Sequence, residues 1–117
     1  MVDLLPYVAE LLAPTKAQIE LAWQDTTTTL PLIVLSMPTN TATTSGGAEI
    51  WSDITIQVDA FDADKLSLIT LVKGIDDIMT PAGFKRSIAQ PFTENGLERY
   101  MMQYRAGVNF SHTDIIL

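Results

Sequence analysis

The sequence contains no cysteine and only one histidine, His112, among its 117 residues. Without cysteine the chain has no disulfide, no thiolate nucleophile and no cysteine-based metal site, and it is not built to rely on an oxidising compartment. Zinc usually takes three or four His and Cys ligands, and a nucleophilic serine or threonine needs a neighbouring base. We therefore predict no catalytic residue, no metal site and no cofactor, and a protein that is not an enzyme.

Cations are scarce as well. Seven Lys and Arg residues stand against fourteen Asp and Glu residues, which gives a formal net charge of −7. Because a grip on phosphate needs clustered cations, we expect neither non-specific nor sequence-specific nucleic-acid binding. Charged residues make up 18% of the chain, against about 25% in average globular proteins. This deficit of charge predicts a surface that is partly covered by a partner. The alternative explanation is a neutral, Thr-rich surface, to which residues 26–29 contribute.

Long hydrophobic runs are absent. The longest uncharged apolar stretch, residues 30–37, is far too short to span a bilayer. Residues 1–4 lack the basic region that begins a secretory signal. We expect no membrane partner, and a location in the cytoplasm or in a particle assembled there.

What the sequence does contain is clear periodicity within a length typical of one domain, residues 1–117. Apolar residues recur at helical spacing over residues 3–12 and predict a short amphipathic helix. Asp3 is placed to cap it, Pro6 falls in its first turn, where a missing N–H costs nothing, and Pro14 ends it.

Alternation of apolar and polar residues predicts strands over residues 15–25 and 30–37, joined as a hairpin by the polar turn 26–29. Residues 38–48 are small, polar and uncharged, and we interpret them as a long loop that is mobile in the isolated subunit. A third alternating segment over residues 49–60 predicts a long strand with one buried face, on which Asp59 lies on the side facing water.

The second half predicts a helix that begins at Asp62 or Asp64 and ends near Met79. Two strands over residues 84–92 and 97–109 then flank Asn-Gly, the strongest short hairpin signal. Residues 111–117 form a tail with an apolar end that either packs on its own domain or docks on a neighbour. The order of elements predicts an α+β fold: a single antiparallel or mixed sheet of about five strands, with two helices packed on one face.

Two groups of side chains are candidates for function. Asp59, Asp62 and Asp64 cluster where a strand meets a helix and could hold Mg²⁺, but helix capping explains them better. Cross-strand pairing could gather the cations of the last hairpin into a basic patch that faces an acidic patch on the next copy of the chain. The alternative is a solvated hairpin face. The predicted interface residues are these cations and the apolar tail: Lys85, Arg86, Arg99, Arg105, Ile115, Ile116 and Leu117.

Three stretches of the sequence together resemble a known family. WSDITIQVDAF over residues 51–61 leads straight into the second helix, GFKR follows at 83–86, and GLERYMMQYRA closes the pattern at 96–106. The arrangement resembles the tail terminator, or tail-completion, proteins of long-tailed phages, including the tail-to-head joining proteins of siphophages. The resemblance covers about residues 30–107, and the Thr-rich segments 26–29 and 38–48 match no pattern of that family.

The resemblance implies a structural virion protein, assembled in the host cytoplasm and located at the head-proximal end of the tail. It implies a homo-oligomeric ring, hexameric in that family, that caps the tail tube, stops its polymerisation and joins it to the head–tail connector protein. The alternatives are another head–tail ring or tube subunit, and a small ligand-binding regulatory domain. A tube subunit would polymerise without limit, and a ligand-binding domain would have a pocket with converging polar groups.

Overall fold

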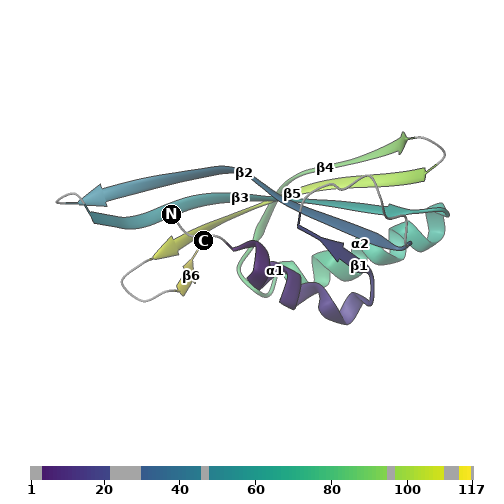
Figure 1. Cartoon of the computed structure of the whole chain (residues 1–117), viewed down its shortest axis with the longest axis horizontal. Coiled ribbons are helices and arrows are strands. Elements are labelled where there is room, and N and C mark those ends of the chain that lie inside the picture. The colour runs from purple at the N-terminus through teal and green to yellow at the C-terminus, as the bar shows by residue number, and fades with distance from the viewer. Residues whose placement is uncertain (1–3, 22–29, 46–47, 95–96, 110–113, 117) are drawn as a thin grey trace.

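The chain folds as one mixed β-sheet with two helices on a single face (Figure 1). The computed structural model describes residues 4–21, 30–45, 48–94, 97–109 and 114–116. The strand order is β1-β2-β3-β5-β4, with β6 paired to β5; β1 is parallel to β2 and every other pair is antiparallel. The predicted α+β class is confirmed. The elements are α1 (Leu5–Leu12), a 3₁₀ turn η1 (Ala13–Thr15), β1 (Gln18–Glu20), β2 (Leu32–Ser45), β3 (Ala48–Asp62), α2 (Lys65–Met79), β4 (Lys85–Glu94), β5 (Leu97–Asn109) and β6 (Asp114–Ile116).

Helix α1 forms where the apolar spacing predicts it, with a proline in its first turn. Its α-helical hydrogen bonding ends at Leu12, and the segment containing Pro14 tightens into η1. Leu4 occupies the N-cap position without a side-chain hydrogen bond, and Asp3, the predicted cap, lies outside the described residues. Val8 and Leu12, which are fully buried, attach the helix to the core.

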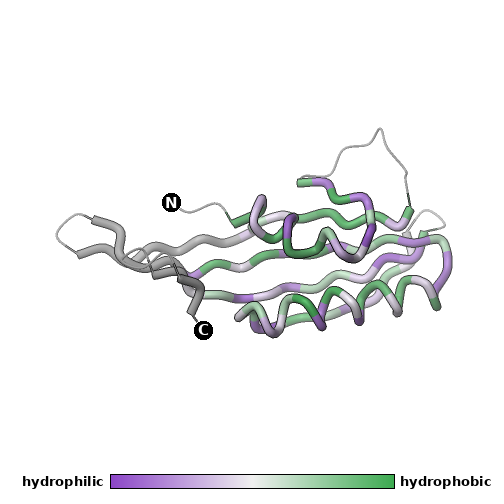
Figure 2. Tube along the Cα trace, turned by 90° about the horizontal axis from the view of Figure 1, so that it is seen from below, coloured by the Kyte–Doolittle hydropathy of each residue, from purple (hydrophilic) through white to green (hydrophobic). Residues whose placement is uncertain are grey.

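Helix α2 begins directly after Asp64, whose carboxylate accepts a hydrogen bond from the Ser67 backbone N–H at 3.2 Å. This is the predicted capping interaction, and it satisfies one of the free N–H groups of the first turn. Apolar and hydrophilic positions alternate around the helix turn by turn (Figure 2). The buried stripe consists of Leu68, Leu71, Val72, Ile75 and Met79.

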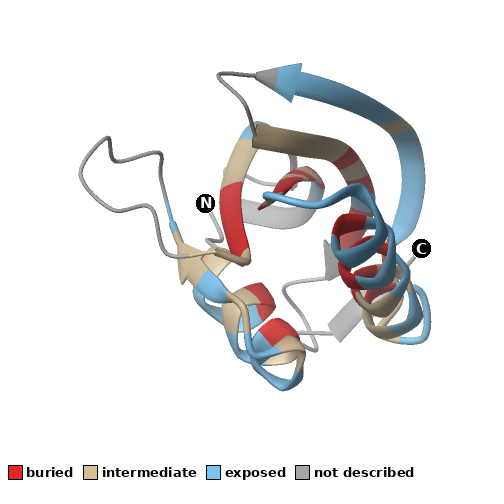
Figure 3. Cartoon of the chain, turned by 90° about the vertical axis from the view of Figure 1, so that its right-hand side faces the viewer, coloured by how far each residue is buried: buried red, intermediate tan, exposed pale blue. Residues whose placement is uncertain are grey.

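The core lies between the two helices and the sheet face they cover (Figure 3). Because side chains alternate along a strand, every second residue of the central strands points toward the helices. The strand residues of this core are Ile33, Leu35, Ile54, Ile56, Val58, Ala60, Met102, Tyr104 and Ala106. Among the described residues, no helix is both long enough and apolar enough to cross a membrane.

The structure corrects the prediction of a first hairpin. The strand predicted over 15–25 is described only as the short β1, and it pairs in parallel with β2, with Ile19 opposite Ile33. The alternation of apolar residues is the same for parallel and antiparallel neighbours, so it could not fix the direction. The predicted turn at 26–29 lies outside the described residues.

The structure also corrects the predicted loop at 38–48, because most of it is strand. β2 continues to Ser45 and β3 begins at Ala48, and the two pair along their whole length with irregular register after Ser36 and after Thr43. Threonine is β-branched and favours strands, and two residues of Gly-Gly between paired strands are a hairpin signal. A loop was predicted because residues 38–48 lack the alternation of apolar and polar residues that marks a half-buried strand.

These long strands make the molecule elongated, with principal extents of 51 × 28 × 22 Å. Its radius of gyration is 15.0 Å, against about 13.4 Å for a compact domain of this length. β2, β3 and β5 continue past both helices, and β6 lies beside the end of β5 (Figure 1). We call this part the extension: residues 39–45, 48–53, 107–109 and 114–116.

Candidate assembly surfaces

The sheet face opposite the helices, here called the outer face, is covered by no helix within the described part of the chain. Cross-strand partners share a face, so the register defines its residues. Val34, Asp59, Met101 and Gln90 form one such row across β2, β3, β5 and β4. The outer face therefore presents mixed apolar and polar side chains from four strands.

A hydrogen-bonded network crosses the middle of the outer face. Arg99 donates to Asp59 Oδ1 from Nε at 3.0 Å and from Nη2 at 2.9 Å. Asp59 Oδ2 accepts from Gln57 Nε2 at 2.9 Å, and Gln57 Oε1 accepts from Gln103 Nε2 at 3.1 Å. Asp59 is only 6% exposed. The prediction that Asp59 faces water is wrong, because its charge is paired and shielded by its neighbours.

Aromatic rings enclose the arginine of this network. The Arg99 guanidinium carbon lies 5.7 Å from the centroid of the Phe61 ring and 5.4 Å from that of Phe92, distances at which a cation is attracted to an aromatic face. Phe61 also belongs to a small second core with Leu32 and Val34. Ion pairing, hydrogen bonds and aromatic contacts thus join β3, β4 and β5 on this part of the outer face.

The predicted basic patch divides into separate parts. Lys85 and Arg105 are cross-strand partners on the outer face, both exposed, and no ion pair is present for either within the described residues. Arg86 lies opposite Tyr104 on the helix side, where it approaches Asp76 at 3.7 Å. Arg99 holds Asp59 and lies six residues, or about 20 Å, along β5 from Arg105. Only Lys85 and Arg105 remain as a joint cationic site.

Tyr104 connects β5 to α2. Its ring is fully buried and its hydroxyl donates to Asp76 Oδ1 at 2.9 Å. Burial first, and then the hydrogen bond to Asp76, raise the pKa of Tyr104 above its ordinary value of 10.0. The neutral phenol is therefore the form that the fold stabilises.

We expect Tyr104→Phe to lower the free energy of unfolding by about 1 kcal/mol at neutral pH, because it removes one partly buried hydrogen bond. The raised pKa adds a pH signature. The neutral Tyr104 phenol contributes fully to the free energy of unfolding below about pH 10, and this contribution is lost as the pH rises through the higher folded-state pKa. Urea unfolding at about pH 8 and about pH 11 should show the wild-type advantage shrinking at the higher pH. An advantage that is unchanged or larger at the higher pH would contradict the assignment.

The apolar tail residues lie at the edge of the extension. Ile115 and Ile116 belong to β6, whose backbone pairs with Val108 and Gly107 of the same chain. Leu117 lies outside the described residues. The backbone of β6 thus pairs with its own domain, and the prediction that the tail residues form an interface stays a prediction.

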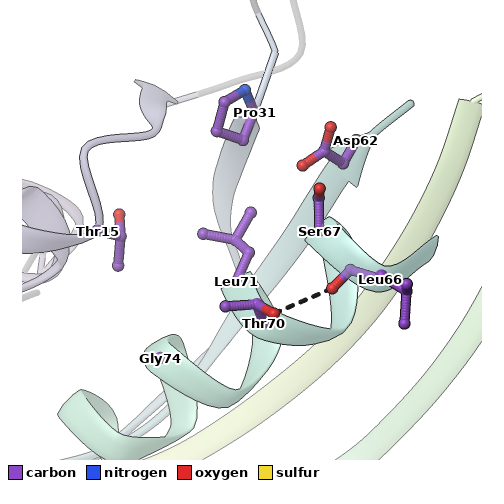
Figure 4. Close-up of a pocket in the computed structure, with 8 residues that line it drawn as sticks. All are labelled: Thr15, Pro31, Asp62, Leu66, Ser67, Thr70, Leu71 and Gly74. Atoms are coloured by element: carbon purple, nitrogen blue, oxygen red, sulfur yellow. Dashed lines mark hydrogen bonds between the residues drawn. The ribbon is translucent and has the colours of Figure 1, made fainter. Parts of the chain in front are cut away.

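A pocket of about 530 Å³ opens at the other end of the molecule, beside the first turns of α2 (Figure 4). Its hydroxyl groups have local partners: Thr15 donates to the Leu12 carbonyl, Thr70 to the Leu66 carbonyl and Ser67 to the Asp64 carboxylate. They do not converge on a common point. The lining residues are Thr15, Pro31, Asp62, Leu66, Ser67, Thr70, Leu71 and Gly74.

Gly74 lies in the interior of α2 on the wall of this pocket. A Cβ added there would have no atom within 4 Å. Because glycine in a helix interior costs about 1 kcal/mol relative to alanine, Gly74→Ala should raise the free energy of unfolding by 0.5 to about 1 kcal/mol. Urea denaturation measures this, and a loss of stability would contradict the open space beside the helix.

The three aspartates considered for Mg²⁺ have separate structural roles. Asp59 pairs with Arg99, Asp62 Oδ1 accepts from the Ala63 backbone N–H at 2.8 Å, and Asp64 caps α2. Within the described residues, no three His, Cys, Asp or Glu side chains gather in a way that could hold a metal ion. His112 lies outside those residues.

Comparison with protein-family models and with curated proteins finds no match to this chain. Three surfaces within the described part of the chain are candidates for function. These are a sheet face without helices, an extension beyond the core, and an exposed pair of cations in an acidic chain.

Proposed function

We propose that this protein is a structural virion protein, a tail terminator or tail-completion subunit that forms a hexameric ring. The ring caps the tail tube, ends its polymerisation and joins it to the head–tail connector. The observation that carries the proposal is the extension, which prolongs a single sheet beyond both helices. Strands without a packed layer contribute little stability on their own, so the extension is best accounted for as a surface for other subunits.

The charge distribution supports contact between copies. Lys85 and Arg105 lie directly opposite each other, and like charges in that position repel. In a chain of net charge −7, a nearby acidic surface on a second copy would relieve the repulsion. Complementary patches on different parts of one subunit produce head-to-tail contacts, which close into rings.

The acidic balance also suits a channel for DNA. The extension contains Glu49, Asp53 and Asp114 and no lysine or arginine. An acidic bore repels the phosphate backbone, so DNA passes without binding to the wall.

The test is the mass of the purified protein across a range of concentrations, with electron microscopy of mixtures with tail tubes. We expect one closed ring size and tubes capped at one end. Filaments that lengthen without limit would indicate a tube subunit instead. A monomer at every concentration, with tubes present as well as without, would remove the proposal.

A charge-reversal pair tests the contact. Lys85→Glu with Arg105→Glu should raise the concentration needed for ring formation at least tenfold, about 1.4 kcal/mol, because it places acids against acids. The matched control is Lys65→Glu with Lys73→Glu, which makes the same change in net charge on exposed positions of α2. An equal effect of the two pairs would show that only net charge matters.

The pocket favours one second candidate, binding of a small, largely apolar ligand. Its volume, about 530 Å³, falls within the roughly 300–1,000 Å³ of ligand sites. Gly74→Leu would place a side chain in this space. Under the leading proposal the variant assembles as the parent does. Loss of function in a variant that still forms rings would favour the ligand-binding role.

A further inference from the structure

The two edges of the sheet differ in what covers them. β1 pairs with β2 only from Leu32 to Val34. From residue 35 to residue 45 the outer edge of β2 has no strand partner within the described part of the chain. In the extension the strand order is β2-β3-β5-β6, so β2 and β6 are its two edges.

The β2 edge in the extension lacks the charges and prolines that keep strand edges from pairing, and its one register irregularity lies near its end, after Thr43. Residues 39–45 read TNTATTS, with four threonines and no charge, proline or glycine. The edge strand β4, in contrast, carries Lys85, Arg86 and Pro91 and has a register irregularity after Arg86. Charges, prolines and bulges are the usual means of protecting an edge. An uncharged, β-branched edge of seven residues is one that pairs with another strand.

Strand direction indicates which strand fits. β5 is antiparallel to β3, as β2 is, and β6 is antiparallel to β5. β6 therefore runs antiparallel to β2. If two copies lie side by side with their sheets in the same orientation, as neighbours in a ring do, β6 of one copy meets β2 of the next in antiparallel fashion. One row of partners crosses the extension: Ala42, Ser52, Val108 and Ile115.

We propose that residues 39–45 of β2 pair with β6 of a second copy of this chain, so that the sheet continues from subunit to subunit. This inference rests on the proposed ring and identifies one of its contacts, separate from the one at Lys85 and Arg105. Antiparallel pairing supplies backbone hydrogen bonds to both exposed edges at once. Pairing of β2 with β2 about a two-fold axis would satisfy only one kind of edge and would stop at a dimer.

Engineered disulfides test the contact directly, because the natural chain has no cysteine. The first variant combines Ala42→Cys with Ile115→Cys, and Asn40→Cys or Thr44→Cys with Ile115→Cys samples a stagger of two residues. Within one chain β2 and β6 are three strand spacings apart, about 14 Å, too far for a disulfide, which needs Cα atoms within about 7 Å. Any bond formed must therefore join two copies. Mild oxidation should give a ladder of covalent oligomers that ends at the ring size.

Controls separate the outcomes. Each single cysteine variant should give no ladder, and Gln90→Cys with Ile115→Cys, which moves the partner to the β4 edge, should give none either. Complete dimerisation of Ala42→Cys alone would replace the inference with two-fold β2 pairing. Rings of normal mass without cross-links in any of the three pairs would overturn the inference and leave the proposed function intact. Absence of rings in the parent chain would remove both.

Discussion

Replacing Asp59 with alanine is expected to lower the free energy of unfolding by about 3 kcal/mol, because it removes the buried carboxylate that pairs with the Arg99 guanidinium and accepts two of its hydrogen bonds. The Asp59 side chain is 9% exposed and that of Arg99 is 27% exposed. Water reaches the arginine in part, so the lower end of the range for broken buried pairs applies. Urea denaturation of the purified variant measures the loss.

A double-mutant cycle shows whether the loss comes from the pair. Arg99→Ala and the double variant should together reveal a coupling of at least 1 kcal/mol, since charges in contact are not additive. Asp77→Ala, an exposed acid on α2, is the matched control and should change stability by less than about 0.5 kcal/mol. A loss below 1 kcal/mol for Asp59→Ala, or full additivity of the two single losses, would mean that the network does not hold this end of the sheet.

The network also bears on assembly. Arg99 lies between Phe61 on β3 and Phe92 on β4, so it ties the edge strand to the centre of the sheet. Removing Asp59 therefore loosens the outer face as well as lowering stability. At temperatures where the Asp59→Ala variant remains folded, weaker ring formation would place the outer face in or beside a contact.

The fold was predictable wherever local chemistry and burial agreed. In α2 the apolar stripe, the capping Asp64 and the end at Met79 all point to the same helix, and the structure has that helix. The strand pattern of β3 similarly identified Ile54, Ile56 and Val58 as core residues. In both elements each signal lies within a few residues of the chain, so no tertiary information was needed.

The errors concern what the local sequence does not contain. The direction of β1 depends on its contact with β2 rather than on its own residues. Residues 39–45 lack apolar alternation, so their strand is specified by pairing with β3 and by the short connection at 46–47. The threonine content of this segment and the Gly-Gly pair after it favour a strand hairpin. Its polarity and its lack of charge favour a loop, and the loop was therefore predicted.

The candidate surface was predictable only in part. Lys85 and Arg105 were placed on one hairpin correctly, and the register makes them neighbours. Arg86 points to the other face of the sheet, because successive residues of a strand alternate between faces. Asp59 alternates with buried residues and so was assigned to water, but its face is itself partly buried by Phe61 and Arg99. A strand pattern shows that two faces differ, and it does not show what covers the more polar one.

Leu12→Ala should have the largest effect on stability, a loss of about 3–4 kcal/mol. The side chain of Leu12 is fully buried in the main core, and alanine leaves a cavity in its place. α1 has eight residues, no acid in its first turn and no base in its last turn. A helix this short is not stable alone, so its packing residues hold it in position. Urea denaturation measures the global loss, and amide hydrogen exchange should show α1 opening first.

Leu66→Ala provides the control for this effect, because it makes the same substitution in a helix at a site that is 74% exposed. Its stability should change by less than about 0.5 kcal/mol. If Leu12→Ala lost no more than Leu66→Ala, α1 would not be packed on the sheet as described. If exchange in α1 and in α2 accelerated equally, the helix would be part of one cooperative unit with the core. Faster exchange confined to α1 would show that β2 and β3 keep their pairing without it, and such a variant would test whether ring formation needs only the sheet.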